Sequence, residues 1–247
     1  MYQQNNIKAY SAFRASNYDD ESKLDKGNRE QHRNFLVDLL CSQKNAPTSF
    51  LDLGCGTGYF TEVFYEIFPR INGYLVDGSQ EMLDIAQDRF LSRQLKAHLH
   101  CALFENINWH QMPAKVDVIF SALAIHHLQD ADKWKLFQRI YDHLDDGGIF
   151  ILYDLFKLKD QQGSALLEYL ACRDHQRRLQ AELDLDELID ELSIENITAN
   201  DRRIRGEEGD KEAFLDDQLH HLAAAGFKHI TTVFQEARFA GTIAYKS

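Results

Sequence analysis

The stretch of sequence that decides the fold is Phe50-Leu51-Asp52-Leu53-Gly54-Cys55-Gly56-Thr57-Gly58. Its apolar first half predicts a short buried strand, and Thr61–Phe68 after it has the spacing of a helix. Gly54 permits a tight turn, and Gly56 lets a ligand approach the backbone without a Cβ in the way. Gly58 begins the helix, whose free N–H groups face the ligand. The stretch therefore predicts a nucleotide-binding loop between a strand and a helix.

The spacing of the glycines bears on which nucleotide is bound. Dinucleotide dehydrogenases favour the pattern G-x-G-x-x-G, whose third glycine would fall at Tyr59, a ring that crowds the packing of helix on strand. Asp52, two residues before the loop, suits an ammonium group better than a pyrophosphate, and the helix N-terminus suits a carboxylate. The pattern therefore favours a cofactor with an amino-acid moiety over a nicotinamide dinucleotide.

An acidic residue ends the next predicted strand, Asn72–Asp77. A carboxylate at this place can accept hydrogen bonds from both hydroxyls of a ribose. An aspartate after a strand can also be a simple turn residue or helix cap, but the glycine loop upstream favours the ribose role for Asp77. Ser79 is the predicted N-cap of a helix that runs to about Arg93, with apolar residues such as Met82 at helical spacing.

Strands and helices alternate along most of the chain. Further strands are predicted at 98–101, 116–121 and 149–153, helices at 29–40, 130–144 and 218–225, and a C-terminal hairpin at 227–234 and 239–246. Strands that alternate with helices form right-handed βαβ units, and these build a parallel sheet with helices on both faces. The sequence therefore predicts an α/β fold that the antiparallel hairpin closes at one edge.

Four stretches, in this order, resemble class I S-adenosylmethionine-dependent methyltransferases of the small-molecule type: Leu51–Gly58, Val76–Leu83, Val116–Ser121 and Leu144–Gly148. The resemblance covers the chain from about Phe50 to Asp154. It implies a Rossmann-like, seven-stranded and mostly parallel sheet, with six strands parallel and the last antiparallel. It also implies an enzyme that binds S-adenosylmethionine, transfers its methyl group in line to an acceptor, and releases S-adenosylhomocysteine.

The resemblance and the composition together divide the chain into four parts. We predict an N-terminal helical arm or cap at 1–48, an S-adenosylmethionine-binding core at 49–154, a helical insert or lid at 155–212, and a C-terminal helix and β-hairpin that complete the core sheet at 213–247. The insert is predicted from its composition, which is rich in charge and in helix-forming residues where the alternation of strands and helices stops.

The resemblance also implies a role for each residue of the cofactor site. Asp52 and the glycine loop would cradle the methionine part, and Asp77 would hold the ribose. Met82 would pack on the adenine, unless it is simply a core residue, and the backbone of Phe104 would face the adenine edge. Residues after the fourth strand would lie along the methionine part. The predicted cofactor-binding residues are Asp52, Gly54, Cys55, Gly56, Gly58, Asp77, Gly78, Met82, Phe104, Ser121 and Ala122.

Two positions depart from the pattern of the family. An apolar residue usually follows the ribose-binding acid and covers the adenine, and here that residue is Gly78. A polar residue usually follows the third strand and binds the adenine amino group, and here that residue is Leu103, with Glu105 two residues further on. Either Glu105 takes this role, or adenine binding relies on the backbone and on the N-terminal arm.

The candidate catalytic residues lie where the fourth and fifth strands end, at the usual crevice of open α/β sheets. His126 and His127 follow the fourth strand, and histidine has an ordinary pKa that suits proton removal near neutrality. Asp154 ends the fifth strand. Each of the three residues also has a purely structural interpretation. A histidine there can cap the next helix or pack in the core, and Asp154 can be a loop residue. A general base is needed only if the acceptor is a hydroxyl or a protonated amine.

Composition limits the partners of the protein. The formal net charge of −12 argues against DNA and RNA, which the average field of the protein would repel. The sequence has no apolar run of transmembrane length and no apolar signal core at its start, so we predict a cytoplasmic protein that crosses no membrane. No residues stand at metal-ligand spacing, so no metal is predicted. Of the possible methyl acceptors, a small molecule therefore remains as the prediction. An exposed lid helix would also allow the protein to form a homodimer.

Side chains outside the core suggest what covers the acceptor. Arg173, Arg177 and Arg178 of the insert are candidate lid cations for an acidic acceptor, although arginines on a helix face are commonly just solvated. Tyr10 and Tyr18 of the arm can close over the cofactor or have an ordinary packing role. The insert and the arm are therefore the predicted walls of the acceptor pocket.

Three other functions stay open. Carboxy-S-adenosylmethionine synthases of tRNA modification have C-terminal halves similar to this one, and Arg203 could meet the extra carboxylate of their cofactor. A binding module that has lost turnover is compatible with the departures at Gly78 and Leu103. A dehydrogenase is disfavoured by Tyr59.

Overall fold

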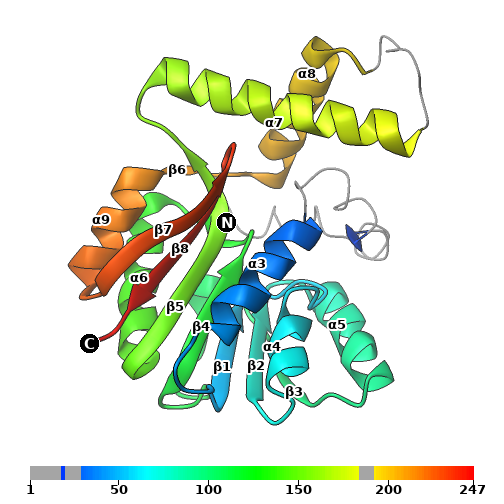
Figure 1. The fold of residues 1–247 in the computed structure, drawn as a ribbon. Coiled ribbons are helices and arrows are strands. Elements are labelled where there is room, and N and C mark those ends of the chain that lie inside the picture. Colours follow the sequence, from blue (N-terminus) through cyan, green and yellow to red (C-terminus); the bar gives the residue numbers. More distant parts are fainter. Residues whose placement is uncertain (1–17, 20–28, 184–191) are drawn as a thin grey trace.

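A central sheet carries the fold in the computed structural model, which describes residues 18–19, 29–183 and 192–247. Its strands lie in the order β3-β2-β1-β4-β5-β8-β7, and the short β6 pairs with the end of β5 (Figure 1). The strands are β1 (Ser49–Leu53), β2 (Asn72–Asp77), β3 (Ala97–Cys101), β4 (Val116–Ala122), β5 (Leu144–Lys157), β6 (Ala213–Phe214), β7 (Lys228–Glu236) and β8 (Phe239–Tyr245). Tyr10 of the predicted arm and residues 184–191 of the insert lie outside the described residues.

The directions of the main strands confirm the predicted sheet. Strands β1 to β5 pair in parallel with one another. β8 is antiparallel to both β5 and β7, so that β7 again runs with the parallel strands. Along the main path of the sheet, β8 is therefore the strand that runs against the others, as the family resemblance implies.

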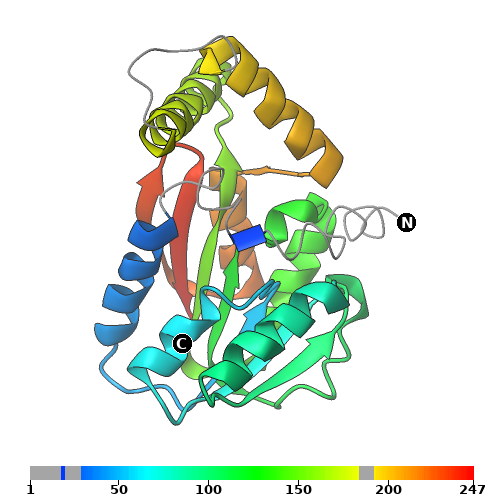
Figure 2. The ribbon, with the colours of Figure 1, turned by 90° about the vertical axis from the view of Figure 1, so that its right-hand side faces the viewer.

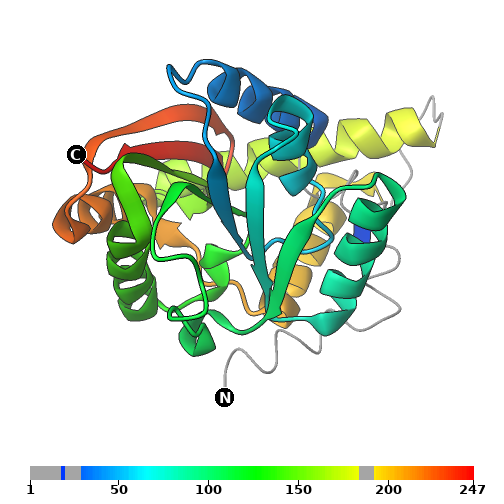
Figure 3. The same ribbon diagram turned by 90° about the horizontal axis from the view of Figure 1, so that it is seen from below.

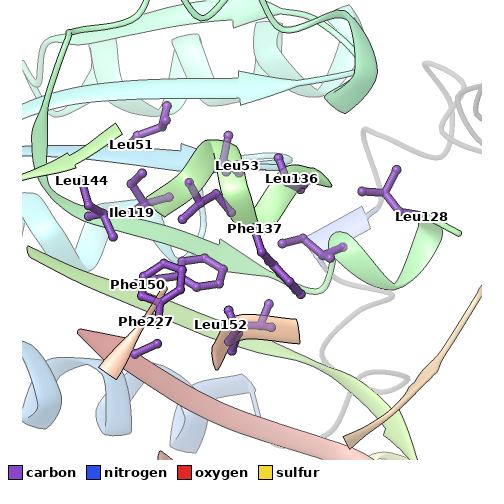
Figure 4. Packing of buried hydrophobic residues seen from close by; sticks show 14 of the residues in the cluster. Leu51, Leu53, Ile119, Leu128, Leu136, Phe137, Leu144, Phe150, Leu152 and Phe227 are labelled. Atoms are coloured by element: carbon purple, nitrogen blue, oxygen red, sulfur yellow. The ribbon is translucent and has the colours of Figure 1, made fainter. Parts of the chain in front are cut away.

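Helices cover both faces of this sheet (Figure 3). α3 (Arg29–Cys41), α4 (Thr61–Ile67) and α5 (Gln80–Ser92) pack on one face, and α6 (Asp130–His143) and α9 (Leu215–Ala225) pack on the other. Each face has a core of its own. On the first face Phe50 stacks on Phe64 with ring centroids 4.3 Å apart. On the second face the ring of Phe150 lies between those of Phe137 and Phe227, with centroids 6.0 Å away in each case (Figure 4).

Local chemistry sets the start of α5. Ser79 has an extended backbone, and its side chain accepts a hydrogen bond from the backbone N–H of Met82 at 3.2 Å, as an N-cap does. Met82 and the other buried residues of the helix, Leu83, Ala86 and Phe90, lie at the helical spacing seen in the sequence. The cap holds the helix N-terminus beside the end of β2, where the predicted ribose site lies.

Two helices lie over the carboxyl ends of the strands (Figures 1 and 2). α7 (Gln161–Glu182) and α8 (Ile194–Glu208) follow β5 and precede β6, within the predicted insert. Arg205 of α8 binds Glu168 of α7 at 2.8 Å, so the two helices are joined by an ion pair. None of the helices in the described ranges is long and apolar enough to cross a membrane.

β5 begins earlier than the sequence predicts, at Leu144 rather than at Ile149. Leu144 already pairs with Val116 of β4, and the backbone of Gly147 and Gly148 bonds to Lys246 after β8. The two glycines therefore belong to an irregular part of the strand, whereas the sequence predicts that they form a turn before it. This difference lies at the end of the sheet far from the carboxyl ends of the strands.

Candidate functional site

A cavity of about 980 Å³, counted with its open mouth, lies at the carboxyl ends of the parallel strands. The loops after β1, β2, β3 and β4 line it, together with two residues from the N-terminal part of the chain. Its lining residues are Tyr18, Arg29, Asp52, Gly54, Cys55, Gly56, Thr57, Tyr59, Phe60, Val76, Asp77, Gly78, Ser79, Met82, Ala102, Leu103, Phe104, Phe120, Ala122, Leu123, Ala124 and His127. Most of the predicted cofactor-binding residues are among them.

The three glycines of the loop have different surroundings. All three have positive φ, at +78° for Gly54, +53° for Gly56 and +76° for Gly58. A Cβ on Gly54 would lie 2.2 Å from the Cβ of Ala124, whereas a Cβ on Gly56 would meet no atom within 4 Å. A Cβ on Gly58 would lie 2.7 Å from the ring of Phe90. Gly56 therefore leaves open space for a ligand, while Gly58 does not line the cavity and instead lets α5 pack closely.

Asp52 is a buried carboxylate with one oxygen satisfied and one not. Asp52 is only 2% exposed, and its Oδ2 accepts a hydrogen bond from the hydroxyl of Thr61 at 2.5 Å. Oδ1 has no hydrogen-bond partner among the described groups. Burial raises the pKa of Asp52 to about 7, against the hydrogen bond from Thr61, which lowers it. A cation beside Oδ1 would relieve this unfavourable burial.

Asp77 is held in place by backbone N–H groups. The N–H of Gly56 donates to Oδ2 at 2.8 Å, and the N–H of Ser79 donates to Oδ1 at 2.8 Å. Burial raises the pKa of Asp77, and the hydrogen bonds from the backbone oppose that rise. Each carboxylate oxygen keeps a lone pair for a ligand, so the residue can accept from a pair of hydroxyls as well.

The end of the cavity at which the sequence places the adenine is mostly apolar. Gly78, Met82, Leu103 and Phe104 line it, and Glu105, the proposed substitute for a polar residue after β3, does not. Cys55, which the sequence also assigns to the cofactor, lines the cavity, and burial raises the pKa of its thiol well above the ordinary value. The thiol is therefore protonated at neutral pH and contributes surface rather than charge.

Ser121 lies outside the cavity, contrary to its predicted place along the methionine part. Its hydroxyl donates to the backbone oxygen of Leu53 at 2.6 Å, and the residue is fully buried. Phe120 and Ala122, on either side of it, do line the cavity. Neighbouring residues of a strand point to opposite faces, so a strand that presents Phe120 and Ala122 to the ligand turns Ser121 away.

The N-terminal part of the chain adds a buried cation that the sequence did not suggest. Arg29, at the start of α3, is 6% exposed and lines the cavity, with its guanidinium 4.2 Å from the centroid of the Tyr59 ring. It also lies 3.6 Å from Asp19, which accepts a hydrogen bond from the hydroxyl of Thr57 at 2.8 Å. The Nε of Arg29 has no hydrogen-bond partner among the described groups. The arginine is therefore available to an acidic group in the cavity.

The predicted catalytic residues form one cluster, and a fourth residue joins them. Nδ1 of His126 lies 2.5 Å from Oδ1 of Asp154, and the backbone N–H of His126 donates to the other oxygen of Asp154 at 2.9 Å. Oδ1 of Asp210, which follows α8, lies 3.5 Å from Nε2 of His126 and 3.2 Å from Nδ1 of His127. No local pattern in the sequence marks Asp210, because its approach to the histidines depends on the path of the insert.

Only one member of this cluster borders the cavity. His127 lines it, whereas His126 and Asp154 are each 1% exposed and lie behind the wall. Burial lowers the pKa of His126, but the attraction of Asp154 and Asp210 outweighs it and raises that pKa to about 10. The two histidines hold the pKa of Asp210 well below its usual range, against the effect of burial. Without another ligand the cluster is thus a buried set of opposite charges.

Comparison with known proteins also supports a methyltransferase domain in the part of the chain that forms the cofactor cavity. Residues 50–148 match the family model described as a methyltransferase domain. The chain is 23% identical over 212 residues to the carboxy-S-adenosyl-L-methionine synthase of Campylobacter fetus subsp. fetus, a match that covers 85% of this chain and 83% of the relative. It is 31% identical over 108 residues to the malonyl-[acyl-carrier protein] O-methyltransferase of Bacillus cereus, covering 44% of this chain and only 38% of that protein.

Solved structures share the fold at low sequence identity. An S-adenosylmethionine-dependent methyltransferase from Clostridium acetobutylicum matches with a TM-score of 0.58 and 19% identity, over 87% of this chain and 90% of the other. Human N-acetylserotonin methyltransferase, solved in complex with S-adenosylmethionine, matches with a TM-score of 0.56 and 17% identity, over 97% of this chain and 60% of that protein. At these identities the likeness is one of fold.

Proposed function

We propose a small molecule as the methyl acceptor of this chain, whose residues 50–148 form a methyltransferase domain of the class I S-adenosylmethionine-dependent family. The observation that supports the cofactor site most directly is the unpaired Oδ1 of Asp52 at the wall of the cavity. The ammonium group of S-adenosylmethionine is the cation that fits there. Asp77 then accepts from the ribose hydroxyls, and Gly56 admits the ligand to the backbone.

The protein has mainly to align the two reactants. S-adenosylmethionine carries an activated methyl group on a sulfonium, so the transfer is a displacement in which the acceptor attacks the methyl carbon and the bond to sulfur breaks. Asp52 and Asp77 fix the two ends of the cofactor, and Phe120, Ala122 and other apolar residues near it exclude water. These groups set the position of the methyl group rather than its reactivity.

We place the acceptor in a second cavity, which lies between α7 and α8 and the ends of β5 and β8. It measures about 1180 Å³, counted with its opening. Asp210 lines this cavity, and it is in contact with His127, which lines the cofactor cavity. Of the three candidate lid cations, Arg178 lines it as well, whereas Arg173 and Arg177 do not. An acceptor held there would reach the cofactor past His127, which can orient it by a hydrogen bond.

The cofactor assignment is tested by calorimetry. We expect S-adenosylmethionine and S-adenosylhomocysteine to bind, nicotinamide dinucleotide not to bind, and Asp77→Ala to weaken both sulfur nucleosides about 100-fold, since two hydrogen bonds to a charged group are lost. Asp84→Ala is the matched control, because this exposed acid on α5 bonds only to Gln80 among the described groups. Equal affinity in the two variants would refute the ribose role of Asp77.

A second function, that of a carboxy-S-adenosylmethionine synthase, is favoured by the match of such a relative over 85% of the chain. The buried Arg29 supports it too, since a guanidinium in the cavity can bind an added carboxylate. Arg203, which we expected in this role, is instead exposed on α8, pairs with Glu207 and lines neither cavity. The mass of the ligand that co-purifies with the protein separates the two functions: a carboxylated sulfonium would favour the synthase, and unmodified S-adenosylmethionine or S-adenosylhomocysteine the methyltransferase.

A further inference from the structure

Three side-chain atoms that are typical metal ligands meet beside the cofactor cavity. One ring nitrogen each of His126 and His127 and one carboxylate oxygen of Asp210 lie within 4.8 Å of one another, and no other group of this kind occurs among the described residues. We propose that these three atoms bind one divalent transition-metal ion. The proposal departs from the expectation of no metal, which was based on sequence spacing, because that spacing brings the two histidines together but leaves Asp210 far along the chain.

The distances suit ligands around an ion better than they suit hydrogen bonds. Oδ1 of Asp210 lies 3.5 Å from Nε2 of His126 and 3.2 Å from Nδ1 of His127. Hydrogen bonds between nitrogen and a carboxylate are typically about 2.7–2.9 Å long. Two ligand atoms of a tetrahedral zinc ion with bonds of about 2.1 Å are roughly 3.4 Å apart. Both contacts to Asp210 are therefore close to the spacing of neighbouring ligands.

Asp154 supplies the outer part of such a site. It lies 2.5 Å from Nδ1 of His126 and accepts a second hydrogen bond from the backbone of the same residue. A histidine that donates its Nδ1 hydrogen to a carboxylate has the lone pair of Nε2 free for a metal, which is the usual arrangement around metal-binding histidines. Nε2 of His126 and Oδ1 of Asp210 are both buried without a hydrogen-bond partner among the described groups.

The fold holds Asp210 in this place. The backbone N–H of Lys211 donates to the backbone oxygen of His126 at 2.7 Å, so the segment after α8 is tied directly to the histidine loop. The buried side chain of Lys133 also bonds to the backbone oxygen of Lys211. The negative charges of Asp210 and Asp154 together offset the double charge of a divalent ion. The site is therefore fixed in geometry and balanced in charge.

The donor set indicates the kind of ion. Two imidazoles and one carboxylate suit zinc, cobalt, nickel or ferrous iron, whereas magnesium and calcium prefer sites made of oxygen atoms. Three protein ligands leave a coordination position open. His127 borders the cofactor cavity and Asp210 borders the second cavity, so the ion would be held between the two. An acceptor oxygen could occupy the open position, and this role, unlike the metal site itself, rests on the proposed function.

The experiment uses the full chain after removal of metals with a chelator. Equilibrium dialysis against Zn²⁺ and Co²⁺, followed by metal analysis, should show one ion bound per chain, and bound Co²⁺ should give the visible absorption bands of a four- or five-coordinate ion. Asp210→Asn and His127→Gln should abolish this binding, and Asp154→Asn should weaken it about 10- to 100-fold. His221→Gln is the matched control, because His220 and His221 of α9 form another adjacent histidine pair that belongs to no such three-residue group among the described residues.

Thermal melting of each variant checks that it is folded, and the cobalt spectrum of the unaltered chain tests the site without any variant. Absence of that spectrum, or binding by Asp210→Asn equal to that of the unaltered chain, would show that the cluster is only a set of ion pairs, and would overturn the proposal. Calorimetry with S-adenosylhomocysteine on the same chelated protein keeps the tests apart. Cofactor binding without metal binding refutes the metal site alone, and metal binding without cofactor binding refutes the proposed function alone.

Discussion

Asp52 illustrates at the scale of a single residue how a binding site opposes stability. Its carboxylate is buried, and only one of its oxygens has a hydrogen-bond partner among the described groups. In the folded chain its pKa is about 7, above the ordinary 3.8, because burial disfavours the charge. The folded chain therefore binds more protons than the unfolded chain between about pH 4 and pH 7, and the free energy of unfolding falls as the pH rises through that range.

We predict that Asp52→Asn stabilises the protein without cofactor at pH 8 by about 1–3 kcal/mol, since a neutral amide avoids burying an unpaired charge. The same variant should bind S-adenosylmethionine far more weakly, because the partner of the ammonium group is lost. Melting curves at pH 5 and pH 8 measure the first effect, and the gain should shrink at pH 5. A variant less stable than the original at pH 8 would contradict this account of Asp52.

Residues of the cofactor site were predictable when their place follows from local sequence. Asp52 lies near the end of β1 and Asp77 ends β2, and each precedes a turn that contains glycine. Their position at the carboxyl edge of the sheet therefore follows from the βαβ rule. Arg29, which also lines the cavity, and Asp210, which lies in the neighbouring histidine cluster, had no such marker. They reach these places through the packing of α3 and through the path of the insert, which are tertiary contacts that no local pattern records.

At the scale of an element, Gly58 serves the packing of α5 rather than the ligand. Its φ is +76°, and an added Cβ would meet the ring of Phe90 at 2.7 Å. We predict that Gly58→Ala lowers the free energy of unfolding by about 2–3 kcal/mol, since it combines an unfavourable backbone angle with a clash in the core. Chemical denaturation measures this loss.

Gly206→Ala is the matched control for this prediction. Gly206 lies within α8, and an added Cβ would meet nothing within 4 Å. Alanine there should raise the free energy of unfolding by about 0.5–1 kcal/mol, because glycine is a poor helix former. If both variants changed stability alike, the contact with Phe90 would not explain the need for Gly58.

Most elements of the sheet and its flanking helices were predictable, and the exceptions share a cause. β2 and α9 carry clear apolar patterns, and the structure places them at or within three residues of the predicted bounds. β6 was missed because two residues cannot show a period, and their strand geometry comes from pairing with the end of β5. Ser121 was misplaced because its orientation depends on which face of β4 meets the ligand.

At the scale of the whole molecule, a charged network joins the lid to the sheet. Arg238, in the turn between β7 and β8, is 8% exposed and bonds to Asp201 of α8 and to Glu212, each at 3.0 Å. We predict that Arg238→Met speeds hydrogen exchange at the amides of α8, because Asp201 and Glu212 lose one of the two arginines that they share, the other being Arg205, while exchange in β1 and β4 stays slow. Mass spectrometry of exchanged peptides reads both effects.

Arg202→Met is the control for the lid. Arg202 is also on α8, but its side chain is 64% exposed and it bonds to Glu168 of α7. A solvated ion pair contributes about 0–1 kcal/mol, so exchange in α8 should change little. Protection of α8 that is unaltered in Arg238→Met would mean that apolar contacts, and not this network, hold the lid.

The position of the lid in the chain has a further consequence for how such a protein can diversify. The segment leaves the core after Lys157 and returns at Ala213, and these two points lie side by side because Phe156 pairs with Ala213 and Lys157 with Phe214. The segment between these two points therefore begins and ends at the same place on the sheet. Its length and sequence can therefore drift over generations while the register of β5 and the cofactor machinery beneath stay unaltered. If the insert holds the acceptor as we propose, new acceptor preferences arise here by exchange of a single continuous segment.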